Sequence, residues 1–157
     1  MADTVEGRLA AAGFELPGKA APPAANYCPF VKTGNLVFIS GQLPMKNGEI
    51  QFKGLCGAEY TTEQAYKAAE LCAINLIAQV REACDGDLSK VKRVVKLGGF
   101  VACGADFTEH PKVINGASDI MAKAFGPAGT HSRAAVGCSS LPFGVPVEVE
   151  GVFEISD

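Results

Sequence analysis

Residues 133–155 read RAAVGCSSLPFGVPVEVEGVFEI, and this stretch carries the strongest fold signal in the sequence. Its second half alternates, as a strand does when one face is buried and the other is polar. The apolar residues of the alternation are Val145, Val147, Val149, Phe153 and Ile155, and the intervening glutamates are Glu148, Glu150 and Glu154. With residues 133–139 as a partner strand and a turn at 141–144, the stretch predicts a C-terminal β-hairpin.

Two helices and a strand are expected before this hairpin. Thr61 and Gln64 form a capping-box pattern, and apolar residues follow them at helical spacing. Residues 91–101 are apolar and β-branched and predict a strand, in which Gly98-Gly99 indicates a bulge or a close approach by another backbone. A second helix is expected over residues 108–125, because a proline suits its first turn.

The N-terminal part predicts weaker elements. Residues 30–31 and 36–40 indicate two strands joined by a tight turn, and residues 49–52 indicate a third, weaker strand. Residues 1–24 predict a short helix at 5–12 and then a connector rich in proline and alanine.

The predicted order is therefore ββ(β)-α-β-α-ββ, an α+β fold with a mixed or antiparallel sheet. A chain of 157 residues falls in the usual range for one domain, so we expect one unit over residues 1–157, with its core at 25–157. Two helices can cover only one face of the sheet. The other face is expected to carry Arg133, Ala135 and Gly137, and because most of its residues are small, subunits are expected to pack there.

Composition excludes several classes of protein. A net charge of −3 offers no basic patch for phosphates, so a nucleic-acid partner is not expected. The sequence contains no run of about 18 apolar residues, so no membrane span is predicted. The acidic N-terminus lacks the features of a secretory signal, which favours a cytoplasmic location for the protein. The six cysteines are scattered without metal-ligand spacing and are expected to serve as core residues with reduced thiols. No nucleotide, dinucleotide or zinc motif is present, so we expect no metal and no cofactor.

Arg133 is the most informative polar residue, because a guanidinium set among alanines requires an anion. A structural salt bridge to a neighbouring glutamate would satisfy it as well as a ligand would. In the predicted hairpin, Gly137 lies opposite Glu148. Arg133 and Glu148 then share a face about 13 Å apart, too far to hold one small substrate within one chain. They could meet if Arg133 of one subunit faces Glu148 of the next. His131, two residues before Arg133, is expected to be an ordinary polar residue rather than a catalytic one.

Two segments resemble the Rid (YjgF-type) family, also labelled endoribonuclease L-PSP. Residues 36–42, LVFISGQ, followed by Leu43-Pro44, are similar to the early strand of that family. Residues 133–136, Leu141-Pro142 and residues 147–150 are similar to its C-terminal signature. The resemblance covers residues 25–155, nearly the whole chain. It implies a chorismate mutase-like fold, assembled as a homotrimer with three sites in clefts between subunits.

The resemblance also implies a reaction. Its deaminases hydrolyse the imine of a 2-aminoacrylate-type enamine, a small substrate that bears a carboxylate, to a 2-keto acid and ammonia. By position, Arg133 would bind that carboxylate and Glu148 would orient or activate water. Tyr27 would contact the substrate, and Ser40 and Gly41 would line the floor of the site.

The sequence departs from the family pattern in two places. Ala135 stands where deaminase members carry a cysteine, and the segment 112–125 is longer than usual, so that either Asn115 or Ser118 could contact the ligand. These departures indicate a divergent branch. A non-enzymatic module that binds 2-keto acids through Arg133 is therefore an alternative, and endoribonuclease activity, which the family label suggests, is another that the acidic charge balance disfavours.

Overall fold

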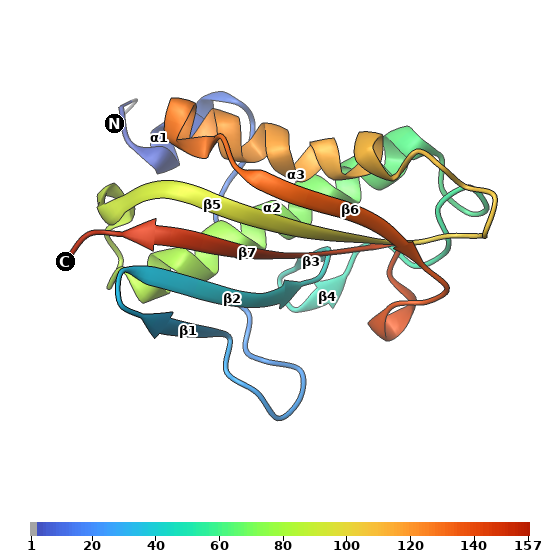
Figure 1. Cartoon of the computed structure of the whole chain (residues 1–157), viewed down its shortest axis with the longest axis horizontal. Coiled ribbons are helices and arrows are strands. Elements are labelled where there is room, and N and C mark those ends of the chain that lie inside the picture. The colour runs from blue at the N-terminus through green and yellow to red at the C-terminus, as the bar shows by residue number, and fades with distance from the viewer. Residues whose placement is uncertain (1–2) are drawn as a thin grey trace.

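The computed structural model describes residues 3–157 as a five-stranded sheet with two long helices against one face (Figure 1). The strand order is β1-β2-β7-β5-β6, in which β5 and β6 are parallel and the other neighbours antiparallel. The sheet consists of β1 (Phe30–Thr33), β2 (Leu36–Gln42), β5 (Val91–Ala102), β6 (Ser132–Cys138) and β7 (Val147–Ile155). The helices are α1 (Val5–Ala11), α2 (Thr62–Ala83) and α3 (His110–Phe125), and a small second sheet pairs β3 (Met45–Lys46) with β4 (Glu49–Ile50).

The predicted C-terminal hairpin is wrong, because β5 lies between β6 and β7 (Figure 1). The chain passes from β5 through α3 into β6, and a strand–helix–strand unit returns its second strand parallel to the first. The segment between β6 and β7 is therefore a crossing connection. It contains the single turn Pro142–Gly144, in which Phe143 and Gly144 both have positive φ.

This register also corrects the assignment of faces. Arg133 pairs with Leu97, and Ala135 pairs with Gly99. Paired residues project to the same side of a sheet, and Leu97 is fully buried under the helices. The side chains of Arg133 and Ala135 thus lie on the helix-covered face, and so does Gly137, which pairs with the buried Val101. The prediction that these three residues lie on the open face is wrong.

Glu148 lies on the opposite face. It pairs with Phe100, which in turn pairs with Val136 of β6, and 48% of Val136 is exposed to solvent. The prediction that Arg133 and Glu148 share a face is therefore wrong. The alternation along β7 is confirmed, since Val147, Val149, Phe153 and Ile155 are buried and its glutamates are not.

The two long helices pack as their local signals indicate. Thr61 and Gln64 form the predicted capping box at the start of α2, and Pro111 lies in the first turn of α3. A Cβ on Gly116 of α3 would overlap the carbonyl oxygen of Tyr66 and lie 3.1 Å from the Cβ of Ala69, so only glycine permits α2 and α3 to approach this closely. A Cβ on Gly99 would likewise meet the side chain of Ile114 at 2.6 Å, so a side chain of α3, and not another backbone as the sequence predicted, lies close to this glycine.

The N-terminal segment runs over the helical layer. Residues 1 and 2, where the predicted segment 1–24 begins, lie outside the described residues. Leu9 of α1 is fully buried, and the Nε of Arg8 donates to the carbonyl of Ala124 at 3.0 Å. Farther along, Arg81 donates to the Pro17 carbonyl and Gln79 to the Ala21 carbonyl at 2.7 Å. The segment is thus attached to both α3 and α2.

Cysteines contribute mainly to the core, as expected. Four of the six are buried: Cys56, Cys72, Cys84 and Cys103. Within residues 3–157, none of the helices is both long and apolar enough to cross a membrane.

Candidate functional site

The guanidinium of Arg133 is bound to α3 by three hydrogen bonds. Its Nη1 donates to Oδ1 of Asn115 at 2.8 Å and to Oγ of Ser118 at 3.0 Å, and its Nη2 donates to the carbonyl of Pro111 at 3.1 Å. Both residues that the sequence offered as ligand contacts, Asn115 and Ser118, thus meet Arg133. They do so because positions three apart on a helix lie on one side of it.

All three acceptors are neutral. Among residues 3–157 no carboxylate lies within 4.0 Å of Arg133, because the salt bridges of this part of the chain join Arg8 to Asp3 and Lys112 to Glu109. A salt bridge within the chain therefore does not satisfy this partly buried charge. An anion from outside the chain could do so.

Not all N–H groups of the guanidinium donate to α3. A guanidinium carries five N–H groups, and the three hydrogen bonds to α3 use both hydrogens of Nη1 and one of Nη2. Within residues 3–157, no acceptor binds the N–H of Nε or the second N–H of Nη2. These groups are on neighbouring nitrogens of one planar group, and such a pair makes bidentate contacts with carboxylates.

Two further positions on β6, Ala135 and Gly137, lie on the same side of the sheet as Arg133. Ala135 is partly buried against the core, so it offers a methyl group beside Arg133 and no reactive atom. Gly137 follows, and a Cβ there would lie 2.5 Å from Nε2 of His110 and 2.9 Å from Sγ of Cys103.

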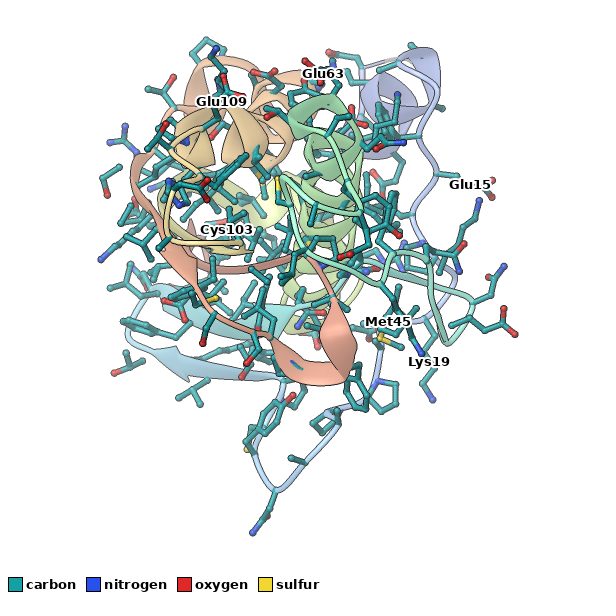
Figure 2. All side chains as sticks on the ribbon, turned by 90° about the vertical axis from the view of Figure 1, so that its right-hand side faces the viewer. Glu15, Lys19, Met45, Glu63, Cys103 and Glu109 are labelled. Carbon is teal, nitrogen blue, oxygen red and sulfur yellow. The ribbon has the colours of Figure 1, made fainter. Side chains whose placement is uncertain are left out.

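Cys103 and His110 are in contact where β5 leads into α3. The Sγ of Cys103 is 3.4 Å from Nε2 of His110, and burial raises the pKa of the Cys103 thiol, which favours the neutral form. Figure 2 views this end of the molecule and labels Cys103 together with Glu109, the residue before α3. The pair is a packed contact beneath Gly137 rather than an activated thiolate.

Glu148 and Gly41 form a second cluster on the open face. A Cβ on Gly41 would overlap Oε2 of Glu148 and lie 2.8 Å from its Cδ, so the carboxylate lies directly over the glycine backbone. Burial and, secondarily, the neighbouring Glu150 raise the pKa of Glu148. A carboxyl group whose pKa moves toward neutrality is suited to exchange protons with water or substrate.

Ser40 precedes Gly41 on β2, and Tyr27 lies in the segment before β1. The Oγ of Ser40 donates to the carbonyl of Cys28 at 2.7 Å, which ties β2 to the segment before β1. The hydroxyl of Tyr27 accepts from the amide of Ala24 at 3.3 Å, and 46% of Tyr27 is exposed. Tyr27 is therefore available to a ligand or to another chain.

The predicted site residues thus form two groups rather than one. Arg133 and Ala135 of the edge strand β6 form one group with Asn115 of α3, whereas Gly41 and Glu148 lie on the open face. Strand β5 separates the strands that carry Arg133 and Glu148. Sequence reasoning missed two contributors to the first group. The Pro111 carbonyl accepts from Arg133, and His131 binds Ser118 with 2.9 Å between Nε2 and Oγ. The closeness of His131 to Arg133 in sequence was the only signal for it.

The protein-family model described as "YjgF/chorismate mutase-like, putative endoribonuclease" matches residues 6–149. The chain belongs to the YjgF family. The match to this YjgF-family chain begins at residue 6 and so includes part of the segment that the sequence resemblance leaves out.

Relatives of this YjgF-family chain have similar length and fold. Protein TCP17 of Trypanosoma cruzi is 42% identical to it over 162 residues and covers all of both chains. The crystal structure of Atu1372 from Agrobacterium tumefaciens, a protein of unknown function, superposes with a TM-score of 0.92 at 50% identity, over 99% of this chain and 94% of the other. A Shewanella oneidensis protein described as a "putative endoribonuclease" superposes with a TM-score of 0.93 at 38% identity, over 98% and 100% of the two chains.

Proposed function

We propose that this YjgF-family protein is a cofactor-independent deaminase that hydrolyses 2-imino acids, formed from 2-aminoacrylate-type enamines, to 2-keto acids and ammonia. The observation that carries the proposal is the guanidinium of Arg133, which is held by neutral acceptors and keeps two N–H groups on neighbouring nitrogens. The carboxylate of a 2-imino acid matches those two donors in charge and in planar geometry.

The site would be completed by a second subunit. Arg133 and Glu148 project from opposite faces of one sheet, so they can act on one small molecule only if Glu148 of another subunit approaches Arg133. The open face supports such assembly, because 45% of Phe38 and 48% of Val136 are exposed there, beside Phe100 and Val152. Exposed apolar side chains gathered on one face favour association. We propose a homotrimer with three clefts between subunits.

In the proposed reaction, water adds to the imine carbon and ammonia leaves. Glu148 as a carboxylate takes one proton from the water while the water oxygen bonds to that carbon. Glu148 then passes this proton to the imine nitrogen and returns to its carboxylate form. The resulting amino alcohol collapses when its hydroxyl proton moves to the nitrogen and the C–N bond breaks, leaving a C=O bond. Arg133 would hold the substrate carboxylate throughout. Because imines hydrolyse readily, fixing one water beside the carbon could suffice.

A second candidate is a non-enzymatic module that binds 2-keto acids. Ala135 favours it, because a methyl group stands beside Arg133 where deaminases of this family are expected to carry a thiol. The module would use the same donors of Arg133 and would not need Glu148.

One assay separates the two candidates. The 2-aminoacrylate imine is generated in place by a serine dehydratase, and keto-acid release is followed with wild type, Arg133→Ala and Glu148→Gln. Arg93→Ala and Glu49→Gln serve as controls, since both residues are exposed and lie outside the two clusters. The deaminase requires release above background that falls to background in both site variants and in neither control. Release at background with wild type rejects deamination of this substrate. Pyruvate binding that is lost in Arg133→Ala but kept in Glu148→Gln would then support the binding module.

A further inference from the structure

A chain of hydrogen bonds runs from the backbone through His131 and Ser118 to Arg133. Nδ1 of His131 is 2.6 Å from the carbonyl oxygen of Gly129, and Nε2 of the same ring is 2.9 Å from Oγ of Ser118. That Oγ is in turn 3.0 Å from Nη1 of Arg133. We propose that Ser118 and His131 are positioning residues that fix the guanidinium of Arg133 in its anion-binding orientation. The inference rests on the proposed role of Arg133 and adds residues that touch no substrate.

The directions of these bonds follow from donor and acceptor chemistry. A carbonyl oxygen can only accept, so Nδ1 of His131 must carry the hydrogen that lies toward Gly129. In the neutral ring Nε2 is then an acceptor, and the hydroxyl of Ser118 must donate to it. The lone pairs of Ser118 are left for Arg133, which can only donate. The neutral imidazole therefore prevents the serine hydroxyl from turning its hydrogen toward the guanidinium.

Local backbone packing positions the carbonyl of Gly129, the first acceptor in this series of hydrogen bonds. The turn Gly126–Gly129 follows α3 directly, and a Cβ on Gly129 would overlap the carbonyl oxygen of Met121 and lie 2.6 Å from its carbon. Glycine alone lets the turn lie this close to the helix. The Gly129 carbonyl is thereby held next to α3, on which Ser118 lies, and His131, the residue before β6, makes a hydrogen bond to each of them.

The energetic value of this arrangement is preorganisation. An arginine side chain loses rotamer entropy when it is fixed in one orientation. Hydrogen bonds that fix it before a ligand arrives remove this cost from the binding step. Ser118 accounts for one of the three bonds that hold Arg133, and His131 acts through Ser118 alone.

The histidine allows a sharp pair of substitutions. The side-chain amide of asparagine falls near Nδ1 of a histidine, and that of glutamine falls near Nε2. His131→Gln can therefore keep an acceptor for Ser118, whereas His131→Asn keeps only the contact with Gly129. Positioning through Ser118 predicts that His131→Gln resembles wild type and His131→Asn resembles Ser118→Ala. A purely structural role for the turn predicts the opposite order.

Two readouts test the inference. The first is the dissociation constant for pyruvate, which is expected to rise roughly tenfold in Ser118→Ala and His131→Asn, as for the loss of one hydrogen bond to a charged group. Ser118→Thr, which keeps the hydroxyl, and His131→Gln should remain within about threefold of wild type on the same scale. The control is Ser132→Ala, since the Ser132 hydroxyl donates to the carbonyl of Val95 and not to Arg133.

The second readout needs no ligand. Nitrogen-detected NMR of the Arg133 side chain, assigned with Arg133→Ala, should show separate Nη1 and Nη2 signals in wild type because hydrogen bonds slow their exchange. Those signals should merge in Ser118→Ala and His131→Asn. Unchanged signals in both variants would overturn the positioning role. If the signals merge as expected while wild type binds no pyruvate, the positioning role stands and the proposed function fails.

Discussion

The carboxylate of Glu148 lies against the backbone of Gly41, in the space that a side chain at residue 41 would occupy. Gly41→Ala is therefore expected to displace this carboxylate, which is the far end of a flexible side chain, with little cost to the fold. Keto-acid release should fall roughly 10²-fold, as when a proton-transferring group is misplaced. Thermal unfolding of the same sample should remain close to wild type. Full activity in a folded Gly41→Ala protein would show that the position of Glu148 is unimportant.

The pH dependence of the reaction should depend on Glu148. Its pKa is raised by burial and, to a smaller extent, by Glu150, and its carboxylate is the form that accepts a proton from water. Activity should therefore rise with pH through a pKa above the ordinary value of 4.5. Glu150→Gln removes one negative neighbour and should move this rise to lower pH in a pH–rate profile. A rise that stays in place in Glu150→Gln would assign it to another group.

The same shift has a consequence for stability with a definite sign. Because its pKa in the folded state is raised, Glu148 binds its proton more tightly there than in the unfolded chain. Its contribution to the free energy of unfolding is thus fully present below the ordinary pKa and is lost as pH rises through the raised one. Glu148→Gln should flatten this part of a stability-against-pH curve obtained by denaturant unfolding.

Packing of α2 against α3 should depend on Gly116. A methyl group there would collide with backbone atoms of Tyr66, which cannot move without shifting α2. Gly116→Ala is expected to lower the free energy of unfolding by about 1–3 kcal/mol, the usual cost of overpacking. Gly18→Ala is the matched control, since a Cβ at Gly18 meets no atom within 4 Å. Equal denaturation midpoints for the two variants would contradict the close helix contact.

Assembly should depend on the apolar part of the open face. Phe38→Glu places a charge where apolar side chains of β1, β2 and β7 lie together, and Val136→Glu does so on β6. Light scattering is expected to show both variants as smaller species than wild type, with keto-acid release lost at the same time. Lys32→Glu, on the other side of β1, should leave the assembly unchanged. Intact assembly in both apolar variants would place the interface elsewhere.

Sequence reasoning succeeded where the signals were local. The capping box at Thr61, the proline at the start of α3 and the alternation along β7 each act within a few residues, and the structure confirms all three. The predicted pairing of β6 with β7 was wrong for a different reason. Two strands close in sequence resemble a hairpin, yet α3 before β6 makes a parallel crossover onto β5, and no local pattern ranks these two pairings.

The error in pairing carried over to the candidate site. Arg133 could be singled out from its residue type and neighbours, but its face depended on the pairing partner, so its contacts with Asn115 and Ser118 could not be derived. The contribution of His131 was harder still. It depends on a turn pressed against α3 and on the tautomer that a backbone carbonyl selects, and both are properties of the folded chain.

The sheet itself keeps Arg133 and Glu148 on opposite sides, so under the proposed function each polypeptide brings half of two different reaction centres. Defects in the two halves should then compensate. When Arg133→Ala and Glu148→Gln chains are co-expressed and purified together, some clefts would receive the intact arginine from one copy and the intact glutamate from the other. Such mixed particles would regain part of the turnover that neither variant shows alone. Turnover at each cleft would then depend on which subunit lies beside it.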